Sequence, residues 1–133
     1  MIRVSLCWSG AALVLLGSSG RAADDHFEKR VRPLLVEKCV SCHGPDKQKG
    51  GLRLDTKEGW RRGGDSGPAI VPRDLEASLL IAAMRHDGSD YKMPPSGKLP
   101  AAIIADFESW IGRGAPGGGA LGSRPDTKGD SVG

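Results

Sequence analysis

Five consecutive residues, Cys39-Val40-Ser41-Cys42-His43, restrict the fold and chemistry of this chain more than any other feature. The chain has three cysteines, and the remaining one, Cys7, lies in an N-terminal segment that we expect to be removed. Cys39 and Cys42 are then a single pair with a histidine directly after it. A structural zinc site needs four Cys or His ligands, and no second cysteine pair completes one.

Two further interpretations fit the pair less well than covalent attachment of a cofactor. A thioredoxin-type redox pair normally lies between a strand and a helix of an α/β domain, and no such alternation surrounds Cys39. A disulfide would suit an exported protein, but it would not require His43. Cys-x-x-Cys-His is the attachment motif of c-type haem, because its spacing lets each thiol add to one porphyrin vinyl group. The motif predicts one haem c, held by two thioethers at Cys39 and Cys42, with His43 as an axial ligand of the iron.

Residues 1–22 have the layout of a secretory signal peptide: Arg3 near the start, an apolar run from Ala11 to Leu16, and small residues up to Ala22. This run is far shorter than the roughly 20 residues needed to cross a bilayer, so we expect no membrane span after cleavage. Cys7 precedes the run, which excludes the arrangement of a lipoprotein. We therefore expect the remaining chain to be periplasmic or otherwise exported.

Composition indicates a small domain with sparse regular structure. Of 133 residues 38% are apolar, and there are 20 glycines and 9 prolines. So few apolar side chains make a lean core, which favours an interior filled in part by a cofactor. The formal net charge is only +3, and Arg3 and Arg21 leave with the signal peptide, so binding of nucleic acid is not indicated.

Apolar residues at helical spacing predict an all-α fold with about three helices, which are Asp25 to Lys38, Asp74 to Arg85, and Pro100 to Gly114. Asp25 and Asp74 are the expected N-caps of the first two, and Pro33 is expected to kink or break the first. The segments 44–71 and 87–99 are typical of long loops, and a loop such as 44–71 is expected to wrap around the haem. Residues 117–133 are expected to be a disordered, glycine-rich tail.

A second axial ligand of the iron usually comes from Met or His. Met93 is the best candidate, because Pro94 and Pro95 restrict the backbone of its loop. Met84 lies on the apolar face of a predicted helix, where methionine is more often part of the core. His86 is the second choice, and the sequence also leaves open His26, Met84 or an iron without a sixth ligand.

The sequence resembles a class I cytochrome c, and more narrowly the planctomycete-type cytochrome c domain, over about Phe27 to Pro116. The segments that carry the resemblance are Pro33 to Leu35, Cys39 to Gly44, Lys49 to Asp55, Gly63 to Pro72, Ser78 to Leu80, Met93 to Pro95, and Trp110 with Ile111. It implies a small cytochrome c-like fold over residues 23–116, in which long loops wrap one haem attached to Cys39 and Cys42 and ligated by His43 and Met93.

The resemblance also implies that the first and last helices cross, which would set Phe27 and Val31 against Phe107, Trp110 and Ile111. One departure concerns Arg73, which stands where the family often has glycine after Ile-Val-Pro. We therefore expect the middle helix to start differently in this chain.

These features predict a monomeric one-electron carrier, not an enzyme, with redox partner proteins as donor and acceptor. No catalytic residue is assigned, because an iron with two protein ligands binds no substrate. The alternative is a haem-based sensor or ligand-binding module with an open or displaceable distal site. A peroxidase-type enzyme would need an open iron and a distal acid-base residue, for which only His26 and His86 are available.

The sequence leaves the roles of two groups of polar residues undecided. The first group faces either the haem propionates or solvent, and it comprises Arg53, Trp60, Arg61 and Arg62. The second group either surrounds the haem edge and steers an acidic partner or is simply solvated, and it comprises Lys47, Lys49, Lys92 and Lys98.

Overall fold

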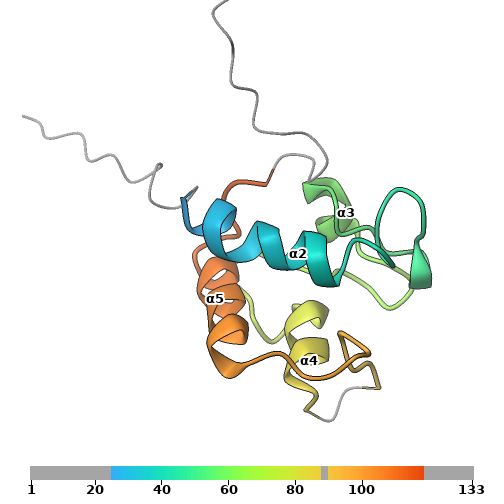
Figure 1. The fold of residues 1–133 in the computed structure, drawn as a ribbon. Helices are drawn as coiled ribbons and strands as arrows, with labels where there is room; N and C mark the ends of the chain where they lie inside the picture. Colours follow the sequence, from blue (N-terminus) through green and yellow to red (C-terminus); the bar gives the residue numbers. More distant parts are fainter. Residues whose placement is uncertain (1–24, 88–89, 119–133) are drawn as a thin grey trace, which may run out of the picture.

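A computed structural model describes residues 25–87 and 90–118 of the chain (Figure 1). The predicted signal peptide lies outside these residues, as does the predicted tail apart from its first two. Within the described ranges the chain forms helices and turns without a strand, which is compatible with the all-α class. None of the helices in these ranges is long and apolar enough to cross a membrane.

The elements follow one another as a π-helical turn η1 (Phe27–Val31), α2 (Arg32–Lys38), a 3₁₀ turn η2 (Lys49–Gly51), α3 (Lys57–Arg62), α4 (Leu79–Arg85) and α5 (Ala101–Gly112). The first and last predicted helices are therefore confirmed as helical segments. α5 begins one residue after Pro100, which serves as its N-cap.

The irregularity expected at Pro33 takes the form of a wide turn that precedes it. The backbone N–H of Arg32 bonds to the carbonyl of Phe27, five residues back, and regular α-helix begins only from Arg32. Pro33 then occupies the first turn of α2. Because proline has no backbone N–H, it cannot continue the hydrogen bonding of the preceding helical turn, which fits the wide turn at this point.

The prediction of a loop over 44–71 was wrong at Lys57–Arg62, where the structure has the short helix α3. Thr56 caps this helix, since its hydroxyl accepts a hydrogen bond from the Gly59 N–H at 3.0 Å. Trp60 is fully buried and anchors α3 to the core. A single buried side chain in six residues gives no helical period, which is why the sequence pattern missed this element.

The middle helix starts later than predicted, at Leu79 instead of just after Asp74. Asp74 caps a turn: its carboxylate accepts from the Ala77 N–H at 3.0 Å. The buried Ser78 hydroxyl bonds to the carbonyl of Asp74 at 2.6 Å and so joins this turn to the start of α4. Arg73 has a φ of +66°, a conformation that glycine adopts at less cost, which fits the glycine that the resemblance leads one to expect at this position.

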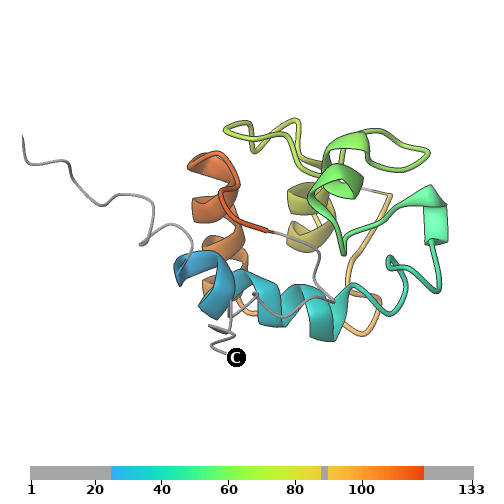
Figure 2. The same cartoon turned by 90° about the horizontal axis from the view of Figure 1, so that it is seen from above.

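The core is an aromatic cluster where η1 meets α5, and both views place these segments side by side (Figure 1, Figure 2). The Phe27 and Trp110 rings lie 5.2 Å apart, and those of Trp60 and Trp110 lie 5.1 Å apart. Val31, Phe107 and Ile111 are buried in the same cluster. The crossing of first and last helices that the resemblance implies is therefore present.

Candidate functional site

The cysteine motif is a hydrogen-bonded turn that continues directly from α2. The backbone N–H groups of Cys39 and Val40 both donate to the carbonyl of Leu35, at 3.0 and 2.9 Å. The N–H of His43 donates to the carbonyl of Cys39 at 3.0 Å. A Cβ atom at Gly44 would collide with the carbonyl of Val40, so the tight turn after His43 requires glycine.

A cavity of about 220 Å³ lies next to this turn. All four predicted site residues, Cys39, Cys42, His43 and Met93, line it. Most of the remaining lining is apolar and comes from segments far apart in the sequence, including Leu34, Leu52, Leu54, Ala69, Leu79, Leu80, Ala83, Met84, Leu99 and Phe107. The fold thus assembles a largely apolar cavity around the predicted site, as the binding of an apolar ligand requires.

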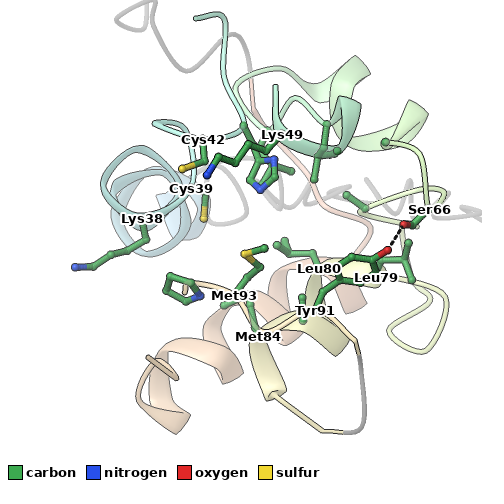
Figure 3. A pocket seen from close by; sticks show the side chains of 18 of the residues that line it. Lys38, Cys39, Cys42, Lys49, Ser66, Leu79, Leu80, Met84, Tyr91 and Met93 are labelled. Atoms are coloured by element: carbon green, nitrogen blue, oxygen red, sulfur yellow. Dashed lines mark hydrogen bonds between the residues drawn. The ribbon is translucent and has the colours of Figure 1, made fainter. Parts of the chain in front are cut away.

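Cys39 and Cys42 lie on one wall of the cavity, and Met93 projects from the opposite wall (Figure 3). Met84 lies on the Met93 side, within α4. The sequence alone placed Cys39 and Met93 more than fifty residues apart, and the fold brings both to one cavity.

Met93 is held through its own backbone. Its N–H donates to the carbonyl of Ala83 in α4 at 3.0 Å, and its carbonyl oxygen lies 3.3 Å from Nε2 of His86. The following peptide bond, to Pro94, is cis. These contacts fix the segment that carries Met93 against the end of α4.

One hydrogen bond joins two loops at the rim of the cavity. The hydroxyl groups of Ser66 and Tyr91 lie 2.9 Å apart (Figure 3), and both residues line the cavity and are exposed. Sequence reasoning did not predict this pair, because the two residues belong to different loops and only the fold brings them together.

Residues 39–97 match the family model described as Planctomycete cytochrome C. The match supports a planctomycete-type cytochrome c domain in this segment. The match begins at Cys39 and includes the whole cysteine motif as well as Met93. Comparisons with curated proteins and with solved structures gave no match. A cytochrome c domain implies a covalently bound haem c with its iron, and such domains are typically exported.

The thiols of the cytochrome c domain fit covalent attachment better than the alternatives. Cys39 and Cys42 are free and not joined as a disulfide. Burial, with a smaller contribution from the neighbouring Cys42, raises the pKa of the Cys39 thiol to about 11. A thioredoxin-type nucleophile needs the opposite, a lowered pKa that yields thiolate. Among the described residues no group of three or more His, Cys, Asp or Glu side chains is placed to hold a metal ion alone.

His43 supplies a second observation that fits a haem. Its Nδ1 atom is buried and has no hydrogen-bond partner within the part of the chain that the structure describes. Buried polar atoms without a partner are rare in folded proteins and point to a functional role or a bound group. An imidazole beside two free thiols, in an apolar cavity, is the donor set that a haem c requires.

Of the other candidate axial ligands, Met84 lies in the cavity wall and the two histidines do not. His86 and His26 do not line the cavity. Nε2 of His86 contacts the Met93 carbonyl, and Nε2 of His26 lies 3.0 Å from the carbonyl of Asp106 in α5. Met84 does line the cavity, and it is buried with the core side chains of α4.

Of the basic and indole side chains whose roles were open, few lie near the cavity. Trp60 donates its indole N–H to the carbonyl of Leu54 at 2.6 Å, and Arg53 pairs with Asp55 at 2.9 Å. Neither residue lines the cavity, and Arg61 and Arg62 also lie outside its wall. Of the four lysines named above, Lys49 alone is in the wall; Lys38, which the sequence did not single out, also lines it but points outward (Figure 3).

Proposed function

We propose that this chain is an exported mono-haem c-type cytochrome that carries one electron at a time between redox partner proteins. Cys39 and Cys42 attach the haem through two thioethers, and His43 and Met93 are the axial ligands of its iron. The observation that carries the proposal is one apolar cavity with the cysteine motif on one wall and Met93 on the other.

The bound haem iron supplies a couple between ferric and ferrous states. The thioether of Met93 is a soft donor that favours the ferrous state, which raises the reduction potential relative to ligation by two histidines. The apolar side chains of the cavity exclude water, and a dry, rigid environment lowers the reorganisation that opposes electron transfer.

The protein acts as a carrier and not as an enzyme. With His43 and Met93 holding the iron, no position would be open to a substrate, and the haem would exchange only electrons with its partners. The donor and the acceptor are proteins, and the carrier works as a monomer in the periplasm or an equivalent exported compartment. A haem-based sensor would differ from this carrier in one respect, because its distal ligand must dissociate readily from the iron.

Substitution of the proposed ligands tests this function. Cys39→Ala combined with Cys42→Ala should abolish haem that resists acid-organic extraction, because no thioether forms. Met93→Ala should keep the covalent haem, lose the weak red absorption band of sulfur ligation in the oxidised protein, and let the reduced protein bind carbon monoxide. Met84→Leu is the matched control and should leave all three properties unchanged. A red band that persists in Met93→Ala contradicts the axial assignment.

A further inference from the structure

The hydrogen bond between His86 and Met93 joins the end of α4 to the proposed distal ligand itself. Nε2 of His86 lies 3.3 Å from the backbone oxygen of Met93. A carbonyl oxygen accepts and never donates, so Nε2 carries the proton in this contact. The other backbone group of Met93 is satisfied by Ala83, also in α4. Both polar backbone groups of this one residue are therefore fixed by the same helix.

His86 has an uncommon backbone conformation for a residue with a side chain. His86 ends α4 in the left-handed conformation, with φ 57° and ψ 24°. Glycine adopts this conformation more readily than any other residue, so a helix end alone does not explain a histidine here. The side chain is half-buried and lies outside the cavity wall, and its only hydrogen bond in the described structure is the one to Met93.

We propose that His86 is a positioning residue for the distal axial ligand. Its hydrogen bond holds the Met93 backbone so that the thioether points into the cavity, and it thereby sets how readily an external ligand displaces Met93 from the iron. This inference rests on the proposed function, in which Met93 ligates the iron. It differs from the role that the sequence left open for His86, because here the imidazole acts through Met93 and does not touch the iron.

The size of the expected effect follows from the strength of one hydrogen bond. Loss of a typical bond of this kind shifts an equilibrium about threefold to tenfold. An external ligand binds only the fraction of molecules in which Met93 has left the iron, so its apparent affinity rises by the same factor. The cyanide affinity of the oxidised holoprotein therefore reports changes in this fraction between variants.

Two substitutions separate the hydrogen bond from the helix end. His86→Asn keeps a side chain that tolerates the left-handed conformation, but its amide is too short to reach the Met93 carbonyl. His86→Gln carries an N–H the same number of bonds from the backbone as Nε2 of histidine. We expect His86→Asn to raise cyanide affinity about threefold to tenfold and to weaken the red absorption band. His86→Gln should restore both properties towards those of the parent protein.

Lys92→Gln is the control for a change beside Met93, since Lys92 is exposed and makes no hydrogen bond or ion pair in the described structure. It should leave cyanide affinity unchanged. Equal affinity in the parent and in His86→Asn would overturn the proposal, as would an equal rise in His86→Asn and His86→Gln.

The Met93→Ala background shows whether His86 acts through Met93. There His86→Asn should cause no further rise in cyanide affinity, and a rise would overturn the positioning role while leaving the proposed function intact. If Met93→Ala alone preserves the red band and the cyanide affinity of the parent, the axial assignment itself fails, and the positioning role fails with it.

Discussion

The two walls of the cavity are built in different ways. The cysteine wall is a continuation of α2, fixed by backbone hydrogen bonds between residues four or five positions apart and supported by the aromatic cluster behind it. The Met93 wall is a loop, held by bonds to α4 and by the rim contact between Ser66 and Tyr91. Local backbone hydrogen bonds therefore shape the turn of the cysteine wall, while contacts between distant segments hold the Met93 wall in place.

Loss of the aromatic cluster should have the largest effect, because it removes the support of the cysteine wall. Trp110 is fully buried and contacts Phe27, Trp60 and Phe107. We expect Trp110→Ala to lower the free energy of unfolding by about 3–5 kcal/mol, measured by urea denaturation of the holoprotein. Val36→Ala, at a side chain that is 48% exposed in α2, is the control and should change stability little. Equal effects of the two would contradict the role of the cluster.

A substitution at Gly44, directly after the cysteine motif, tests the same wall where the backbone leaves no room for a side chain. Gly44→Ala places a Cβ against the carbonyl of Val40, so the turn must shift. We expect a loss of about 1–3 kcal/mol and a lower yield of covalent haem. Gly112→Ala is the matched control, because a Cβ at that position in α5 meets nothing within 4 Å. A normal yield of haem protein from Gly44→Ala would show that the turn is more tolerant than its geometry indicates.

Much of the cysteine wall and the core was predictable from sequence, whereas most of the distal wall was not. The motif residues are adjacent in the chain, and the buried apolar residues of α5 repeat every three to four positions. The local sequence pattern therefore predicts both. Met93 was selected through its prolines, but its bonds to Ala83 and His86 depend on the fold. The six-residue α3 and the late start of α4 were missed, because their caps at Thr56 and Ser78 depend on contacts that no period reveals.

Acid should weaken the segment that links the motif to α3. Hydrogen bonds from Arg53 hold the pKa of the Asp55 carboxyl below its ordinary value, despite an opposing effect of burial. A lowered pKa in the folded state adds stability above the ordinary value of about 3.9, and this stability is lost as pH falls through the folded pKa. Asp55→Asn should therefore be less stable than the parent at pH 7, and the difference should shrink towards about pH 3 in urea titrations. A difference independent of pH would exclude the ion pair as its cause.

The rim contact should have the smallest effect. Ser66 and Tyr91 are exposed, so the bond between them competes with water. We expect Ser66→Ala to cost at most about 1 kcal/mol in unfolding by urea. A double-mutant cycle with Tyr91→Phe isolates the contact, since Ser66→Ala should cost less when the tyrosine hydroxyl is already absent. Additive costs would show that the two hydroxyl groups do not stabilise each other.

The central claim is that the two walls hold a covalent haem with His43 and Met93 on its iron. The most direct test is the absorbance spectrum, oxidised and reduced, of protein exported from cells that mature c-type haem, recorded before and after acid-organic extraction. The account predicts haem that resists extraction, a low-spin reduced spectrum, and the weak red band of sulfur ligation when oxidised. Absence of haem, under conditions in which a control cytochrome matures, would contradict it.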